Sequence, residues 1–217
     1  MQKSLKILFF HNTLPEYRIG WFRNLAQNAD VQFVFTNEQL NKKEYGFTIE
    51  YEKIKDLKCK FLLDGKQGIK DLKQIMGDSI QYDFVELPPI DSLREVIYSA
   101  YIVYVCKKKN IKIGYFWEKW EAPWEKQPLK RRVKNLILRV IPGLIYKRAD
   151  VIFSVGRKNR EYFISNGVKE KKIVWIPDVS ETPDCDYIDL REKFNIPSEC
   201  KTVSYTHLRA HETAANL

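Results

Sequence analysis

Short apolar runs alternate with longer amphipathic stretches from Lys6 to Thr182. The apolar runs predict strands over Lys6–His11, Val31–Thr36, Tyr82–Leu87, Ile111–Trp117, Ala149–Gly156 and Lys172–Ile176. Apolar residues at helical spacing predict helices over Glu16–Gln27, Gly68–Met76, Ser92–Lys109, Leu129–Lys147 and Arg157–Asn166. The segment from Asn37 to Asp78 is rich in lysine and weakly periodic, and it predicts one or two short strands besides its helix.

This alternation predicts the fold class. Strands separated by helices pair in parallel through right-handed crossovers, and runs that are apolar on both faces indicate a sheet covered by helices. We therefore expect a Rossmann-like α/β domain with three layers. Ligands in such sheets bind beyond the carboxyl ends of the strands. The candidate loops follow His11, Leu87, Trp117, Val155 and Ile176.

Composition and charge exclude several classes of protein. The chain has 217 residues, of which 44% are apolar and 30% charged, which is typical of a globular protein and excludes a disordered chain. No apolar run reaches the roughly 18 residues that span a bilayer, and the first ten residues lack the pattern of a signal peptide. The formal net charge of +9 favours anionic partners, whether phosphates, nucleic acid or an anionic membrane.

Several common site types are not indicated. The first strand is not followed by GxGxxG, and the chain has no Walker A loop and no GxSxG elbow, so we expect no bound cofactor. His11 has no identifiable nucleophile partner. Four cysteines without a CxxC pair indicate reduced thiols and a cytoplasmic protein; they are Cys59, Cys106, Cys185 and Cys200.

The C-terminal segment has an unusual composition. Val203–Thr213 resembles the translation of a sequencing adapter. We therefore expect residues 203–217 to be a non-native tail. The spacing of His207 and His211, which on a helix would suit a metal ion, is then accidental, and we predict no metal site.

Two segments carry candidate binding chemistry. The loop after the first strand contains Asn12 and Arg18, and its helix N-terminus and guanidinium could hold a phosphate or carboxylate; alternatively, Arg18 lies in solvent. The segment after Trp117 concentrates tryptophan and glutamate. Indole rings pack on sugar faces and carboxylates accept hydroxyl protons, which indicates sugar binding; alternatively, the rings pack beneath a loop and the glutamates lie in solvent. Its candidate residues are Trp117, Glu118, Trp120 and Glu121.

A basic amphipathic segment follows. Lys126 to Arg148 holds eight Lys and Arg residues and no acidic residue. One interpretation buries its apolar stripe, which includes Ile141 and Leu144, in the core and leaves the charges in solvent. The other docks the basic face on anionic lipid headgroups; its membrane-facing residues are Lys130, Arg131, Arg132 and Lys134. Nucleic acid is less favoured, because no known nucleic-acid-binding signature is present.

The order of several motifs resembles that of a known family. Pro15-Glu16-Tyr17-Arg18 near the start, Ala149–Gly156 with Asn166-Gly167-Val168, and Lys172–Asp178 resemble the N-terminal domain of family 4 glycosyltransferases. Leu190–Pro197 is similar to the segment that precedes the second domain in that family. Together these motifs span most of residues 5 to 200.

The resemblance implies one half of a GT-B enzyme. It implies an acceptor-binding domain over residues 1–180 and a linker over 181–202 that leads into a donor domain missing from a truncated gene. Glu118 stands where many members carry a catalytic histidine, and Ser154, Gly156 and Arg157 would face the phosphates of a nucleotide-sugar.

The resemblance also implies a reaction, an acceptor and a location in the cell. The whole enzyme would be retaining and would transfer sugar to a glycan or lipid-linked acceptor in cell-surface polysaccharide synthesis, at the inner face of the cytoplasmic membrane. The fragment alone would be inactive. Two alternatives remain open: a non-catalytic basic Rossmann-like module that binds anionic membrane or polyanion, and another GT-B enzyme such as a sugar-nucleotide epimerase.

Overall fold

The computed structural model describes residues 4–37, 49–77, 82–90, 92–118, 141–177 and 189–201. The chain divides into two compact units, Met1–Glu181 and Thr182–Leu217. The second unit contains one described helix, α6 (Leu190–Lys193), whose first turn is capped by the carboxylate of Asp189. The predicted tail over residues 203–217 lies outside the described residues.

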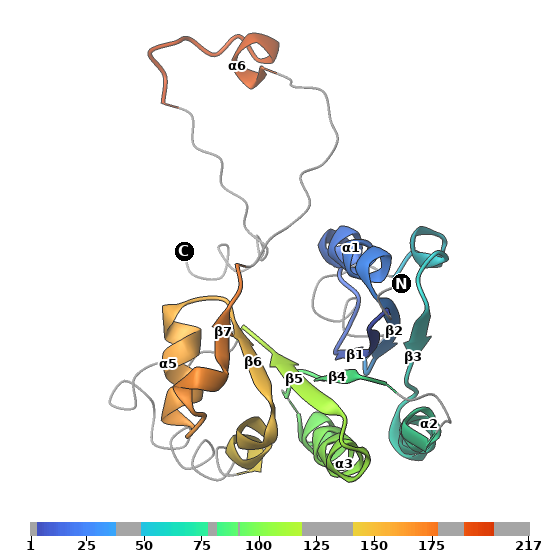
Figure 1. The fold of residues 1–217 in the computed structure, drawn as a ribbon. Helices are drawn as coiled ribbons and strands as arrows, with labels where there is room; N and C mark the ends of the chain where they lie inside the picture. Colours follow the sequence, from blue (N-terminus) through green and yellow to red (C-terminus); the bar gives the residue numbers. More distant parts are fainter. Residues whose placement is uncertain are drawn as a thin grey trace. The chain divides into compact units, whose positions relative to one another are not determined.

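The first unit is built on a seven-stranded sheet in which every neighbouring pair is parallel. The spatial order is β3-β2-β1-β4-β5-β6-β7 (Figure 1). This confirms the predicted parallel α/β architecture. The strands are β1 (Lys6–His11), β2 (Asp30–Phe35), β3 (Cys59–Phe61), β4 (Phe84–Leu87), β5 (Lys112–Phe116), β6 (Val151–Ser154) and β7 (Ile173–Trp175).

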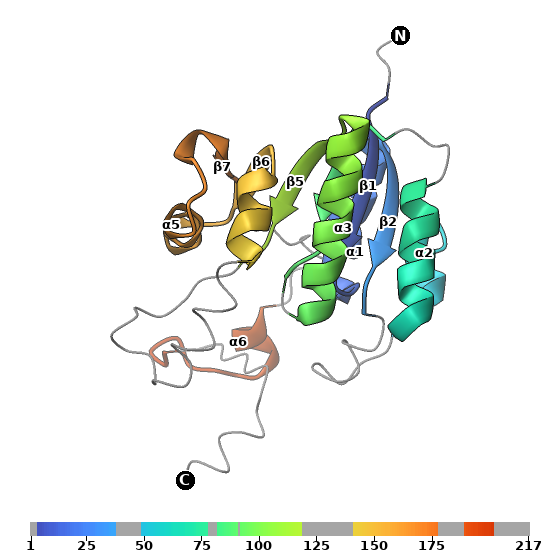
Figure 2. The same cartoon turned by 90° about the horizontal axis from the view of Figure 1, so that it is seen from below.

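Helices cover the two faces of the sheet unequally. On one face, the 3₁₀ turn η1 (Glu16–Arg18), α1 (Ile19–Asn28) and the 3₁₀ turn η3 (Tyr51–Ile54) pack over β1 to β3. On the other face lie α2 (Gly65–Gly77), α3 (Leu93–Lys109), a helix over residues 141–148, and α5 (Arg157–Ser165) (Figures 1 and 2). The result is the expected three-layer arrangement.

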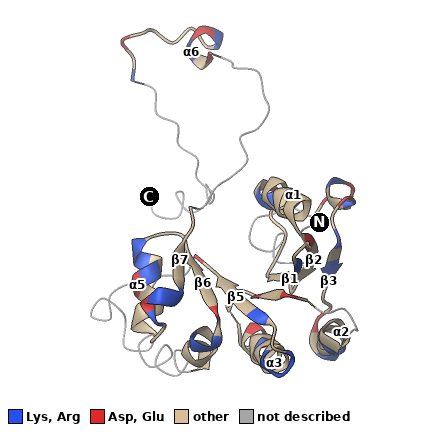
Figure 3. Cartoon of the chain, in the orientation of Figure 1, with Lys and Arg blue, Asp and Glu red and all other residues tan. Residues whose placement is uncertain are grey.

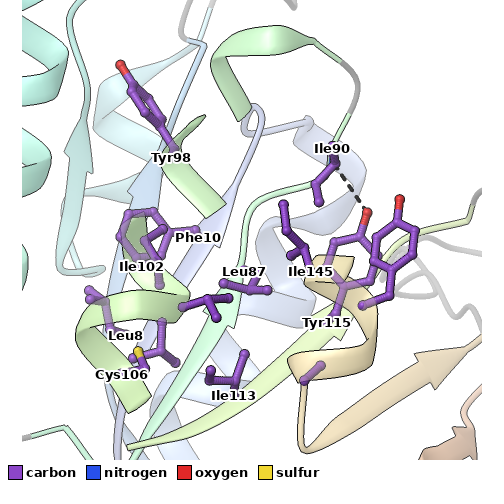
Figure 4. Close-up of a cluster of buried hydrophobic side chains, with 14 of the residues drawn as sticks. Leu8, Phe10, Leu87, Ile90, Tyr98, Ile102, Cys106, Ile113, Tyr115 and Ile145 are labelled. Atoms are coloured by element: carbon purple, nitrogen blue, oxygen red, sulfur yellow. Dashed lines mark hydrogen bonds between the residues drawn. The ribbon is translucent and has the colours of Figure 1, made fainter. Parts of the chain in front are cut away.

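Two hydrophobic cores follow from the alternation of side chains along each strand. Leu8 and Phe10 of β1 join the larger core beneath α3, which also holds Ile102 and Ile113 (Figure 4). Phe9, between them in sequence, faces the smaller core beneath α1. In the larger core the Ile90 N–H donates to the Tyr115 hydroxyl at 3.2 Å, which fixes the loop after β4.

The helix boundaries follow the expected stop signals. Asn110 adopts the left-handed region at φ 56° directly after α3, and Gly167 does so at φ 81° shortly after α5. Both positions end a helix where the chain must turn, which suits asparagine and glycine. The predicted helix over Glu16–Gln27 is instead the 3₁₀ turn η1 followed by α1, because Pro15 in extended conformation opens a tighter first turn.

The expectation that the strands are covered on both faces is wrong at one edge, because Val174 and Trp175 of the edge strand β7 are exposed. Of the apolar stripe that one interpretation buries in the core, Ile141 and Leu144 are exposed, and its other residues lie outside the described part of the chain. The helix over residues 141–148 instead buries Ile145 against β5 and β6, so its packed face is turned relative to the stripe.

Candidate functional site

The carboxyl ends of all seven strands meet at one edge of the sheet, because every pair is parallel. Within that edge, β1 is followed by α1 on one face, whereas β4 is followed by α3 on the other. The neighbouring strands β1 and β4 therefore form a topological switch point, where ligands of open α/β sheets bind. The loop from His11 to Arg18 leaves β1 at this point.

An ion pair joins two loops of this edge that lie 100 residues apart in the sequence. Nη2 of Arg18 donates to Oε1 of Glu118, which follows β5. The guanidinium also lies over the ring of Phe116 at 5.4 Å and over that of Tyr17 at 5.6 Å. Arg18 is therefore buried rather than in solvent, while the Glu118 side chain keeps 41% of its surface exposed.

His11 lies beside this ion pair and is neutral. Its Nδ1 is 2.8 Å from the carbonyl oxygen of Thr13, and because a carbonyl only accepts, Nδ1 carries the proton. Burial, reinforced by the nearby positive charge of Arg18 and opposed by the Thr13 bond, lowers the pKa of His11 to about 3. Its Nε2 is then a buried acceptor with no hydrogen-bond partner among the described residues.

The ring of Trp117 completes the cluster. It meets the His11 imidazole edge to face, with ring centroids 6.2 Å apart. The hydroxyl of Thr13 is also buried and has no partner among the described residues. We call the set His11, Thr13, Arg18, Trp117 and Glu118 the edge cluster. It combines two unpartnered polar atoms, a charged pair and an aromatic ring at the switch point.

The sequence pattern did not select two members of the edge cluster, His11 and Thr13, because neither belongs to a motif with a nucleophile or a metal-ligand spacing. Their position is a usable signal, since His11 ends the first strand of a parallel sheet and Thr13 lies in the loop that follows it. Asn12 is one of the candidate residues from the sequence. Its Oδ1 accepts a hydrogen bond from the Thr13 N–H at 2.8 Å, which stabilises the conformation of this loop.

The donor-facing residues expected from the resemblance lie along the same edge, after β6. Ser154 is fully buried and its hydroxyl donates to the Gly156 carbonyl at 3.1 Å. A side chain at Gly156 would meet nothing within 4 Å. Arg157 is almost fully exposed, with its nearest carboxylate, Glu161, 3.9 Å away on the same helix.

Asn159 ties the two parts of the edge together. Its Nδ2 donates to the Trp117 carbonyl at 2.8 Å, and its Oδ1 accepts from the Val155 N–H at 3.3 Å. The side chain is buried. The first turn of α5 therefore positions the end of β5, and with it Trp117 and Glu118. No motif in the sequence indicates this role of Asn159.

A buried carboxyl lies behind the cluster on β4. Glu86 pairs in register with Phe9 of β1 and Gly114 of β5, and it is 1% exposed. Neither carboxyl oxygen makes a well-formed hydrogen bond with the described residues. Burial raises the pKa of Glu86 well above its usual value, and a weaker backbone contact with Phe116 only partly opposes this. An added Cβ at Gly114 would stand 2.3 Å from Oε2 of Glu86, so glycine leaves the space that this side chain fills.

Other candidate residues lie outside the described part of the chain. These are Trp120 and Glu121, and the membrane-facing set Lys130, Arg131, Arg132 and Lys134. Within the described ranges, no group of three or more His, Cys, Asp or Glu residues is placed to hold a metal ion. In the same ranges, no helix combines the length and apolar character needed to cross a bilayer.

Comparisons with known proteins give a similarity of fold. No family model matches the chain, and no curated protein matches it in sequence. Among solved structures, Anabaena HepE in complex with UDP and glucose superposes with a TM-score of 0.51 at 11% identity, over 80% of this chain and 44% of that one.

Two further structures align at lower scores. The lipopolysaccharide outer core galactosyltransferase WaaB, in its apo form, aligns at a TM-score of 0.45 and 14% identity, over 78% of this chain and 44% of that one. UDP-N-acetylglucosamine 2-epimerase from Rickettsia bellii aligns at 0.48 and 15%, over 79% and 44%. The chain thus spans less than half the length of these three structures.

These findings establish the fold. The chain is an α/β protein whose parallel sheet and flanking helices form a Rossmann-like domain, similar in fold to the part of HepE that it covers.

Proposed function

We propose that this domain is the acceptor-binding half of a glycosyltransferase that transfers sugar from a nucleotide-sugar to a hydroxylated acceptor. The observation that carries this proposal is the edge cluster, in which a neutral histidine, a charged pair and an indole meet at the switch point of the sheet. The fold similarity to HepE, solved with UDP and glucose, supports the class of reaction.

The chemistry of the cluster suits a sugar hydroxyl. The unpartnered Nε2 of His11 can only accept a hydrogen bond, and a hydroxyl is a donor of the right kind. The half-exposed carboxylate of Glu118 can accept a second hydroxyl or take its proton as transfer proceeds. The Trp117 ring offers an apolar surface against which the C–H face of a sugar can pack.

Arg18 acts in this scheme through Glu118. Its guanidinium is held by two aromatic rings and by the ion pair, so it fixes the carboxylate in one orientation. Burial is the main reason that the pKa of His11 is low, and the positive charge of Arg18 lowers it further, which preserves Nε2 as an acceptor. Arg18 is thus a positioning residue, while Glu118 is the residue proposed to meet the acceptor.

The finer features of the proposal come from the family resemblance. We propose membership of family 4, a retaining reaction and a role in cell-surface polysaccharide synthesis. The nucleotide-sugar would bind a second domain, with Ser154, Gly156 and Arg157 facing its phosphates, and no cofactor would be needed. We further propose that the protein works in the cytoplasm, at the inner face of the cytoplasmic membrane.

A glycan array tests this proposal directly. The purified 217-residue protein is expected to be retained by a subset of glycans. Glu118→Gln removes one charge-assisted hydrogen bond and should weaken that retention about 10- to 100-fold. Glu161→Gln, which changes an exposed glutamate on α5 in the same way, should have no effect.

Three outcomes would contradict the proposal. The first is retention on no glycan, and the second is an equal loss for both variants. The third is binding to polyanions such as heparin without preference among neutral glycans, which would favour the non-catalytic basic module. Transfer of labelled sugar by this chain alone would refute the division between acceptor and donor halves.

A further inference from the structure

A groove runs between two helices on the face of the sheet opposite α1. Its volume is about 540 Å³. One wall is α3 and the other is the helix over residues 141–148, and both lie on the same side of the sheet (Figure 2). We call this the helix groove. The lining residues are Ala100, Val103, Tyr104, Lys107, Lys108, Ile141, Leu144, Ile145 and Arg148.

The outer face of α3 is apolar over most of its length. Its exposed positions follow one another at steps of three or four residues and therefore form one row; they are Leu93, Ile97, Ala100 and Tyr104, followed by the pair Lys107 and Lys108. Leu93 and Tyr104 keep 68% and 65% of their surface exposed. The inner face of α3 is also apolar and packs in the larger core. A helix that is apolar on both sides is typically buried on both, so this pattern indicates a partner for the outer face.

The second wall repeats the pattern. Ile141 and Leu144 are 48% and 47% exposed, and Arg148 follows one turn later on the same face. Two neighbouring rows of this spacing form a channel into which a third helix can pack with a row of its own. The row on α3 from Leu93 to Lys107 is about 21 Å long, at about 1.5 Å for each residue, which suits a partner helix of about four turns.

The charged residues of the helix groove all have one sign. Lys107, Lys108 and Arg148 line it, and no acidic residue does so among the described residues. Lys107 is paired with Asp150 at 3.2 Å, whereas no described carboxylate pairs with Lys108 or Arg148. Lysine and arginine are visible at the end of α3 in Figure 3. An acidic partner would neutralise these cations, whereas a second copy of this chain, with its net charge of +9, would add like charges.

A purely structural role explains only part of this surface. Lysines in the last turn of α3 complement the negative end of the helix dipole, and this accounts for their position. It does not account for the exposed Tyr104, Ile141 and Leu144 beside them. A nucleic acid would satisfy the cations but leave these side chains in water.

We propose that the helix groove binds an acidic amphipathic helix of a partner protein. Apolar side chains three and four residues apart on that helix would pack between the two rows, as in other complexes of a helix in a groove. Aspartate and glutamate beside them would pair with Lys108 and Arg148. This surface is separate from the edge cluster, so the proposal does not depend on the proposed glycosyltransferase activity.

A phage-displayed library of random peptides of about 16 residues tests the kind of partner, with the whole 217-residue protein as bait. The enriched peptides are expected to carry apolar residues at i, i+3 or i+4, and i+7, with aspartate and glutamate in excess over lysine and arginine. An enriched peptide is then synthesised with a fluorophore, and its affinity is measured by fluorescence anisotropy. Neutralising Lys108→Gln and Arg148→Gln together should weaken binding about 5- to 30-fold, because two exposed ion pairs are lost.

A matched control separates the helix groove from net charge. Lys66→Gln with Lys70→Gln removes two exposed lysines from α2, on the same face of the sheet, and should change the affinity less than twofold. Leu144→Ser tests the apolar row and should weaken binding about 10-fold. Its circular dichroism spectrum and melting temperature should remain those of the wild type, because the Leu144 side chain is half-exposed.

The proposal fails if the library yields no enriched peptides, or if the enriched peptides lack the apolar spacing or the acidic excess. Equal losses for the two pairs of lysine and arginine variants would show that only net charge matters, which also contradicts it. A wild-type dimer that Leu144→Ser dissociates in sedimentation would assign the helix groove to a second copy of the chain. Displacement of the peptide by phosphatidylglycerol vesicles would assign it to lipid. Glycan retention by the edge cluster is a separate readout, so each of these results leaves the proposed function to its own test.

Discussion

The neutral state of His11 makes the stability of the domain depend on pH in a way that can be measured. The folded protein holds His11 with a pKa of about 3, against about 6.5 in an unfolded chain. Between these values the unfolded state binds a proton that the folded state does not. The free energy of unfolding contributed by His11 therefore falls as the pH drops below 6.5, and it levels off near pH 3.

The magnitude follows from this window. The loss is about 1.4 kcal/mol for each pH unit well inside it, which gives about 2 kcal/mol between pH 7 and pH 5. Glu86 titrates in the opposite sense, because burial raises its pKa and the unfolded chain releases its proton first as the pH rises. In the wild-type protein the two contributions therefore oppose each other above about pH 4.5, so its stability alone does not isolate His11.

The assay isolates His11 by subtraction. Urea unfolding of the wild type and of His11→Asn, followed at several pH values, gives the difference between their free energies of unfolding. Asparagine keeps an amide donor for the Thr13 carbonyl and does not titrate. The wild type should lose about 2 kcal/mol relative to the variant from pH 7 to pH 5. A difference that stays constant, or changes in favour of the wild type, would refute the assignment of His11 as a buried neutral acceptor.

Three further predictions concern the fold around the site. Gly68→Ala should lower stability by about 1–3 kcal/mol in thermal unfolding, because its Cβ would stand 2.0 Å from a backbone carbonyl oxygen, whereas Gly77→Ala on the same helix meets nothing and should be neutral or stabilising. Glu86→Gln should gain stability over the wild type as the pH rises from 5 to 8, and no change with pH would show that Glu86 is ionised in the fold. Asn159→Ala should cost about 1–3 kcal/mol and alter the fluorescence of Trp117, whose carbonyl it holds; unchanged urea unfolding would contradict this role.

The elements that depend on local pattern could be predicted from the sequence. The run Lys6–His11 was expected as a strand and forms β1 with the same bounds. Asn110 was expected to end its helix and does so in the left-handed conformation. In both cases the deciding physics lies within a few residues, either as a continuous apolar run or as a residue that tolerates positive φ.

The arrangement of the site depends on distant parts of the chain and was less accessible. Arg18 and Glu118 were each chosen from their own loops, but the sequence does not show that they pair across the sheet edge. The chemistry of His11 depends on burial and on the charge of Arg18, neither of which the motif contains. Similarly, helical periodicity identified a stripe containing Ile141 and Leu144, whereas contact with the sheet selected Ile145 instead.

The most direct test of the central claim is a titration of the isotope-labelled protein with the glycan that the array selects, followed by nuclear magnetic resonance. The account predicts that His11 begins as a neutral imidazole with its proton on Nδ1. It also predicts that the Nε2 resonance of His11 and the amide resonances of Thr13, Trp117 and Glu118 shift on binding. The amide resonance of Tyr104 on α3, which lies away from the edge cluster, should not shift. Shifts confined to another surface, or a protonated His11 at pH 7, would contradict it.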